Sequence, residues 1–195
     1  IAAKNKVKHV VMHKPIANRL YEGRLVVETA RKTKVATHLL AYGSGAGNGR
    51  IAEQIKQGVI GPLREIHNWT NRPVWPSGIE VGRPEETPEV PPSLDWDLWL
   101  GPAKERPYSP AYCPYKWRFW WDFGTAETGN WGCHILDVPF WALNLRYPTR
   151  VDLDKIPDPA DIDLQRTPKS MLTRLDFPAE PGHGELSLHW WYGGP

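Results

Sequence analysis

Residues 8–42 read KHVVMHKPIANRLYEGRLVVETARKTKVATHLLAY, and this stretch decides the class of fold. The apolar run KHVVM at 8–12 predicts a short buried strand. A helix is expected to follow, with Asn18 as its N-cap and its end near Thr33, and KVATHLLAY (34–42) predicts a second strand. This order of strand, helix and strand, with short connections, predicts a parallel βαβ unit.

The last part of the chain has a different pattern. Two strand-like segments, SMLTRLDF (170–177) and ELSLHWWY (185–192), flank the turn-rich sequence PAEPGHG. In the second segment, apolar and polar residues alternate, which predicts an antiparallel hairpin with one apolar face. The apolar residues of that face are Leu186, Leu188, Trp190 and Tyr192. We therefore expect a partial Rossmann-type parallel unit followed by an α+β part with a large, mostly antiparallel sheet and packed helices.

Between these parts lies a segment rich in proline and tryptophan. The chain has 20 prolines, and half of them lie between Pro73 and Pro114, so this stretch cannot be a regular helix or a central strand. It also contains three of the 11 tryptophans, which favours an ordered arm at about 73–117. Before the arm, GSGAGNG (43–49) fits neither phosphate-binding glycine motif and is interpreted as a turn between domains. A helix at 50–58 and a strand within 61–72 complete this region.

Composition limits the classes of function. The net charge is +2 and the basic residues are scattered, which argues against a nucleic-acid partner. Cys113 and Cys133 form no CxxC motif, and no apolar run is long enough to span a membrane. The first residues lack Met and resemble the end of a helix, so we expect a piece of a longer protein, truncated at both ends. The compartment, cytoplasmic or periplasmic, stays undecided.

The segment TGNWGCHILDVPFWAL (128–143) carries the strongest candidate site. Asn130, His134, Asp137 and Trp141 stand at offsets 0, 4, 7 and 11, which is one face of a helix. Pro139 is expected to kink this helix. The face is interpreted either as a buried polar network or as the wall of an active site.

Two of the candidate residues could handle protons. Lys14 follows a strand, where ligands bind in open parallel sheets, although its position alone favours an ordinary surface lysine in a turn. His134 could act as a general base oriented by Asp137, or it could be a satisfied core histidine. His134 and Asp137 together offer too few ligands for a metal site, so no metal is expected.

Several longer motifs point to one family. They are KHVVMHKPIAN, IKQGVIGPLREIHNWTNRPVWPSGI, PPSLDWDLWLGPA, YCPYKWRFWWDFGT and GNWGCHILDVPFWALNL. Taken in order, they resemble the Gfo/Idh/MocA family, named for glucose-fructose oxidoreductase, inositol dehydrogenase and a rhizopine-catabolism protein. The likeness is greatest to a branch common in bacteria that degrade polysaccharides.

The resemblance implies a two-domain dehydrogenase that moves hydride between NAD or NADP and a sugar or sugar-derived alcohol. Residues 1–42 would then be the end of the Rossmann-like NAD(P)-binding domain, and 43–195 an incomplete substrate and oligomerisation domain. The implied partners are a small carbohydrate and further copies of the chain, joined through the sheet of the second domain. Neither a nucleic acid nor a membrane is expected.

The resemblance also assigns roles to residues. Lys14 and Pro15 match the lysine and proline of the family's EKP motif near the nicotinamide. His134 matches the active-site histidine that accepts or relays the hydroxyl proton, while Asn130, Asp137 and Trp141 would contact the substrate.

Three departures from the family pattern bear on catalysis. His13 replaces the glutamate of the EKP motif, Asn130 replaces the aspartate four residues before the histidine, and AYGSG (41–45) lacks the usual histidine. An asparagine can bond a hydroxyl but cannot carry a proton. The departures leave two alternatives open, namely a relative that cleaves glycosides with bound NAD and a catalytically silent sugar-binding or oligomerisation module.

Overall fold

The computed structural model describes residues 7–40, 46–72, 85–155 and 164–195. The expected helix end at the start of the chain, the AYGSG segment with the domain boundary at 42/43, and the first part of the proline-rich arm lie outside the described residues. Within the described part, no helix is long and apolar enough to cross a membrane.

The first unit is the expected parallel βαβ arrangement. Strand β1 (His9–His13), helix α1 (Leu20–Thr33) and strand β2 (Ala36–Leu40) follow one another, and β1 pairs with β2 in parallel from His9↔Ala36 onward. The prediction of a buried first strand is wrong, because β1 alternates between exposed and half-buried residues. In the described part of the chain, β1 pairs with one strand only, β2, so its other edge has no neighbouring strand.

The expected N-cap of α1 is also wrong. The helix begins after Arg19, and no side chain bonds its first turn. The amide of Asn18 instead donates to the backbone oxygens of Trp121 and Asp122, both at 3.3 Å. Asn18 therefore ties the first unit to a segment about a hundred residues away along the chain.

The second unit is a mixed four-stranded sheet in the order β3-β6-β5-β4. Its strands are β3 (Glu65–Thr70), β4 (Arg150–Lys155), β5 (Met171–Phe177) and β6 (Leu186–Tyr192). The β5–β6 hairpin is antiparallel as predicted, and β4 extends it in the same sense. Strand β3 pairs with β6 in parallel, a neighbour that the sequence pattern did not reveal.

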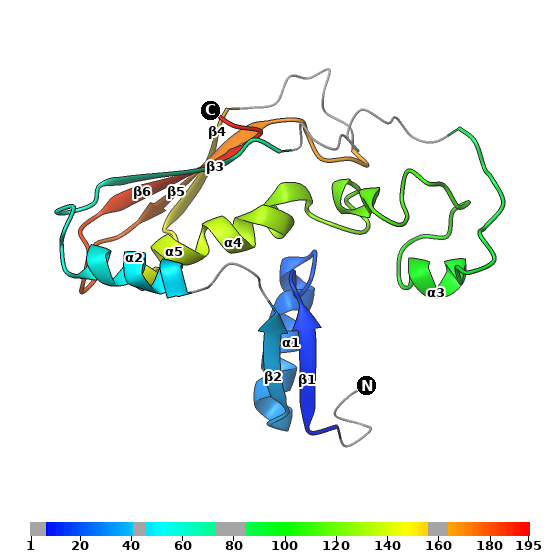
Figure 1. Ribbon diagram of the computed structural model, residues 1–195, viewed down its shortest axis with the longest axis horizontal. Coiled ribbons are helices and arrows are strands. Elements are labelled where there is room, and N and C mark those ends of the chain that lie inside the picture. The colour runs from blue at the N-terminus through cyan, green and yellow to red at the C-terminus, as the bar shows by residue number, and fades with distance from the viewer. Residues whose placement is uncertain (1–6, 41–45, 73–84, 156–163) are drawn as a thin grey trace.

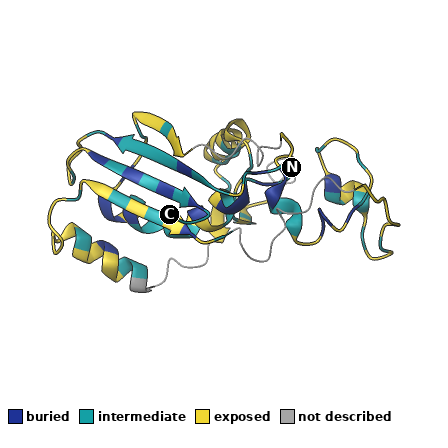
Figure 2. Cartoon of the chain, turned by 90° about the horizontal axis from the view of Figure 1, so that it is seen from above, coloured by how far each residue is buried: buried dark blue, intermediate teal, exposed yellow. Residues whose placement is uncertain are grey.

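One face of this sheet forms the main core. The four alternating apolar residues predicted for the hairpin are all buried on β6 (Figure 2). Leu186, Leu188 and Trp190 pack with residues of helices α2 (Ala46–Lys56) and α5 (Asp137–Leu143), which lie beneath the sheet (Figure 1), whereas Tyr192 packs in a second cluster with Phe119 and Ala126. Leu188 is fully inaccessible to solvent, and burying such a side chain stabilises a fold by about 1.5–3 kcal/mol. Helix α2 starts earlier than predicted, so the end of GSGAGNG is its first turn.

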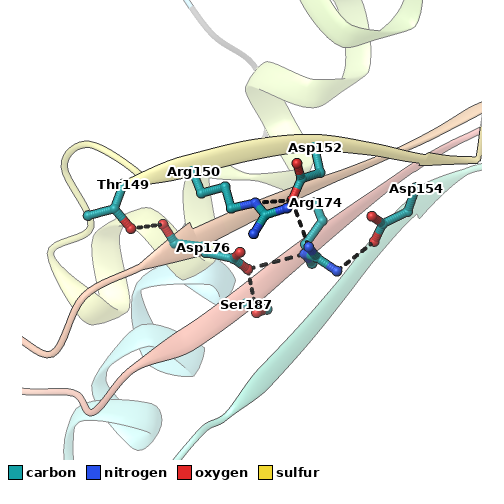
Figure 3. A network of polar contacts seen from close by, with 7 residues as sticks. All are labelled: Thr149, Arg150, Asp152, Asp154, Arg174, Asp176 and Ser187. Carbon is teal, nitrogen blue, oxygen red and sulfur yellow. Dashed lines mark hydrogen bonds and ion pairs between the residues drawn. The ribbon is translucent and has the colours of Figure 1, made fainter.

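The opposite face of the sheet carries charge. The guanidinium of Arg174 on β5 lies 2.7 Å from Asp152 and 3.3 Å from Asp154 on β4, and 3.4 Å from Asp176 on its own strand (Figure 3). The hydroxyl of Ser187 on β6 donates to Asp176 at 2.6 Å. These polar contacts connect β4, β5 and β6, so they help to fix the register of these three strands on the face opposite the helices.

The helix predicted over 128–143 is broken into three pieces. Thr128–Gly132 forms a π-helical turn, a short helix α4 (Cys133–Ile135) follows, and α5 starts after Leu136. The break comes just before Pro139, which has no N–H to donate to the oxygen of Ile135. The proline therefore disturbs the helix as expected, but the predicted single helical face from residue 130 to 141 is wrong.

The described part of the arm, from residue 85 onward, is held by aromatic side chains. Its one α-helix within that part is α3 (Trp96–Leu100), capped by Asp95, whose carboxylate accepts from the N–H of Leu98 at 3.0 Å. The ring of Trp96 stacks on Trp99 at 4.9 Å, and its indole N–H donates to the oxygen of Arg106 at 2.8 Å. These contacts involve two of the three tryptophans on which the expectation of an ordered arm rests, and the arm as a whole stays a prediction.

Candidate functional site

Lys14 joins the two units of the structure. It follows β1, and its backbone N–H donates to Leu40 at the end of β2. Its side chain crosses to the π-helical turn, where Nζ donates to the backbone oxygen of Asn130 at 2.7 Å and to its side-chain oxygen at 2.6 Å. A half-buried lysine with two short hydrogen bonds is not an ordinary surface lysine. Position at a strand end favoured an ordinary surface lysine, and only the family resemblance implied a site role for Lys14; the structure supplies its partner.

The π-helical turn brings Asn130 to Lys14. Turns of this kind are rare and occur often at functional sites. The turn also needs Gly129, because a Cβ atom there would lie 2.1 Å from the Thr125 hydroxyl oxygen and 3.5 Å from the ring of Pro15. The glycine thus leaves room for the Thr125 hydroxyl beside the turn, while Pro15 lies at ordinary van der Waals distance.

Glu127 is a member of the site that the sequence pattern did not indicate. Its side chain is almost fully buried, with 1% exposure, and its Oε2 accepts a hydrogen bond of 3.1 Å from the Asn130 amide. Burial raises the pKa of this carboxyl group above its ordinary value, although nearby Arg72, Arg118 and Lys14 act in the opposite direction. The sequence feature that could have indicated Glu127 is its place as a single acidic residue among the small residues of GTAETGNWG, three positions before Asn130.

The surroundings of Lys14 favour its neutral form. Burial lowers the pKa of its ammonium group, and the guanidinium of Arg118 lowers it further, whereas Cys133 and Glu127 act in the opposite direction. A lysine with a lowered pKa has a larger fraction of free amine near neutral pH, which is the form that accepts a proton. Lys14 is therefore suited to general acid–base chemistry.

Two cavities meet at Lys14. The smaller, of about 150 Å³, is lined by Lys14, Trp117, Arg118, Gly129 and Asn130 together with neighbouring residues. The larger, of about 550 Å³, is open and shares His13, Lys14, Pro15 and Trp117 with the first. Its remaining wall is largely apolar and includes Trp99, Leu100, Pro102 and Phe123. Lys14 therefore contacts two spaces, a small one whose lining includes Arg118 and Asn130 and an open one with several aromatic residues in its wall.

The other predicted site residues lie further along the broken helix. His134 contacts the ring of Trp131 edge-on, with 5.8 Å between ring centroids, and its Nδ1 is buried. Asp137 stands in the first turn of α5. Trp141 packs against α2, where a Cβ atom on Gly49 would lie 3.2 Å from its ring, and the indole is 48% exposed.

The structure thus gathers Lys14, Pro15 and Asn130, whereas His134, Asp137 and Trp141 do not line either of these cavities. The roles that the family resemblance assigns to those three residues stay predictions. Among the described residues, no cluster of three or more His, Cys, Asp or Glu side chains could hold a metal ion.

One comparison with known proteins identifies the family, and another shows the fold. A model of the Gfo/Idh/MocA group, described as "Oxidoreductase family, C-terminal alpha/beta domain", matches residues 53–166. The crystal structure of a provisionally assigned dehydrogenase from Bordetella bronchiseptica RB50 has the same fold, with a TM-score of 0.50 and 16% sequence identity. The match covers 97% of this chain and 39% of that protein, so the chain spans well under half of its length. No curated protein matches the sequence significantly. Since the family model covers more than half of the chain, the protein belongs to the Gfo/Idh/MocA oxidoreductase family.

Proposed function

We propose that the protein takes part in hydride transfer between NAD or NADP and a sugar or sugar-derived alcohol. The observation that carries this proposal is the double hydrogen bond from Lys14 to Asn130 at the junction of two cavities. It places a lysine with a lowered pKa beside a space of about 150 Å³ whose lining includes the polar side chains of Arg118 and Asn130. Membership of an oxidoreductase family supports the reaction class.

The proposed role of Lys14 is to hold the proton of the reacting hydroxyl group. When an alcohol becomes a carbonyl, the C–H electron pair leaves as hydride and the O–H proton must go to a base. As a free amine, Lys14 has two N–H groups, and both are engaged by Asn130. Its lone pair then remains for the hydroxyl proton, and the resulting ammonium group can return that proton in the reverse direction.

The larger cavity suits a nicotinamide ring. Flat aromatic ligands bind in largely apolar clefts of a few hundred Å³, and this cavity of about 550 Å³ has three aromatic residues in its wall, Trp99, Trp117 and Phe123. The bound dinucleotide would supply hydride acceptance or donation at the nicotinamide. The chain would hold it beside Lys14 and Pro15, which both cavities share.

The smaller cavity suits a carbohydrate. Sugars need hydrogen-bonding groups together with flat apolar surfaces, and Asn130, Arg118 and Trp117 offer both kinds of contact. His134, four residues after Asn130, is proposed to relay protons, with Asp137 as its orienting partner. Trp141 is proposed as a further substrate contact. Self-association through the four-stranded sheet remains part of the same proposal.

Calorimetric titration of the chain with NAD(H) and NADP(H), followed by a sugar screen for reduced cofactor, tests the proposal. Binding of a dinucleotide and net NADH or NADPH formation with a sugar would support it. Sugar release without net reduced cofactor would indicate a glycosidase-like relative instead. Binding of a sugar without any dinucleotide, in this chain and in a longer protein that contains it, would overturn hydride transfer and indicate a binding module.

A further inference from the structure

We propose that Glu127 is a positioning residue for Lys14, and that it acts by fixing the orientation of the Asn130 side-chain amide. The contacts form a chain of three groups. Glu127 Oε2 accepts from Asn130 Nδ2 at 3.1 Å, and Asn130 Oδ1 accepts from Lys14 Nζ at 2.6 Å. This inference deepens the proposed function and rests on it, because the ligand that Lys14 would meet in the cavity is the proposed substrate.

The amide of Asn130 stands between a donor and an acceptor. A lysine ammonium only donates and a carboxylate only accepts, whereas an amide has one end of each kind. One orientation satisfies both neighbours. The reversed orientation would place the NH₂ group against the ammonium and the amide oxygen against the carboxylate. Glu127 therefore selects the orientation in which the amide oxygen faces Lys14.

This orientation decides what Lys14 offers to the cavity. An ammonium has three N–H donors, and two of them are bound by the side-chain and backbone oxygens of Asn130. In the ammonium form, one N–H donor is left for the cavity that Lys14 lines. In the amine form, one lone pair is left instead. If the amide turned over, Lys14 would lose one of its two fixed partners and its nitrogen would no longer be held in place.

The burial of Glu127 makes its effect on Asn130 strong. The side chain is 1% exposed, so water does not replace it as an acceptor. The charged groups that act on it are Arg72, Arg118 and Lys14, while Lys14 itself is also influenced by Cys133. The family's aspartate is an asparagine in this chain. Glu127, three residues before Asn130, thus supplies a carboxyl group to the same site. It is linked to Lys14 through the Asn130 amide.

Competitive labelling of the lysines with acetic anhydride, read by mass spectrometry, tests the inference without substrate or dinucleotide. Only the free amine reacts, so the labelling rate of Lys14 across pH reports how well its charged form is held. Glu127→Met removes the acceptor at similar side-chain length, and Glu127→Gln keeps an acceptor oxygen but no charge. Glu22→Gln makes the same change on exposed α1 and serves as the matched control.

We expect Glu127→Met to speed Lys14 labelling near neutral pH about tenfold. The Asn130 amide would no longer be held with its oxygen towards Lys14, so the charged Lys14 ammonium would lose that hydrogen bond and the free amine would become more abundant. Glu22→Gln should stay at the wild-type rate, and Glu127→Gln should speed labelling much less than Glu127→Met, because it removes the charge but keeps an acceptor oxygen. If Glu127→Gln speeds labelling as much as Glu127→Met, the charge of Glu127 matters and its orienting role is excluded. An unchanged rate in Glu127→Met overturns the inference as well.

A second measurement covers the case in which Glu127→Met does not fold. Hydrogen exchange of the Asn130 side-chain NH₂ group, followed by NMR in the wild-type chain, should be slow because one hydrogen is bonded to a buried carboxyl group. Exchange as fast as that of an exposed asparagine would overturn the inference. Both readouts can fail while dinucleotide binding and sugar oxidation succeed, so this inference and the proposed function are tested separately.

Discussion

The amino group of Lys14 lies 2.6 Å from the side-chain oxygen of Asn130, although 116 residues separate them in the sequence. The contact joins the end of β1, in the parallel unit, to the π-helical turn beside the four-stranded sheet. Lys14 lines both the small cavity beside Asn130 and the open cavity whose wall includes Trp99 and Phe123. We therefore expect the proposed dinucleotide and the proposed sugar to bind next to each other at Lys14.

Replacing Lys14 by methionine should abolish most turnover while leaving the fold intact. Loss of a general acid or base lowers a rate by about 10²- to 10⁴-fold, and methionine keeps the length of the side chain. His134→Ala should lower the rate in the same way if the histidine relays the proton. Initial rates of NADH or NADPH formation measure the effect, and Lys32→Met on exposed α1 is the matched control. Full activity in both variants would contradict the mechanism.

Asn130→Asp should move the pH dependence of the reaction to higher pH. A carboxylate facing the Lys14 ammonium favours the charged form, which counteracts the lowering of its pKa by burial. The free amine then forms only at higher pH, so the rising, acid-side limb of kcat/KM against pH for sugar oxidation shifts to higher pH. A pH–rate profile that does not move, in a variant with unchanged thermal unfolding, would show that Lys14 is not the titrating base.

Glu127 should make the stability of the protein fall as the pH rises. Burial raises its pKa in the folded state above the unfolded value of about 4.3, so the folded protein binds more protons between these two values. The free energy of unfolding therefore decreases with pH in that window. Urea denaturation between acid and neutral pH should show a shallower decline in Glu127→Gln than in the wild type. Parallel curves would mean that Glu127 ionises as easily in the folded state as in the unfolded state.

Gly124→Ala should destabilise the fold next to the site. A Cβ atom at Gly124 would lie 2.7 Å from both the Cα and the backbone oxygen of Arg118, and neither atom belongs to a flexible side chain. Overpacking of this kind costs about 1–3 kcal/mol or more. Gly184→Ala is the control, because nothing lies within 4 Å of its added Cβ. Equal midpoints of thermal unfolding for the two variants would contradict the expected difference.

Sequence patterns predicted the elements whose faces are set by local periodicity. The alternation of Leu186, Leu188, Trp190 and Tyr192 predicted the buried face of β6 correctly. The βαβ unit was predicted from its apolar runs and short connections, and Pro139 marked a disturbance in the helix. Each of these features depends on neighbours within a few residues. The sequence could not show that the helix would begin as a π-helical turn, which changes the face that Asn130 occupies.

The sequence by itself determined the family, the parallel first unit and the apolar face of the hairpin, because periodicity and long motifs are local properties of the chain. Only the tertiary structure decided that Lys14 bonds Asn130, that Glu127 is buried behind them and that β3 lies parallel to β6. Each of these depends on which distant segments pack together. Hydrophobic burial sets that packing for the molecule as a whole, and the pattern of a single segment does not reveal its partner.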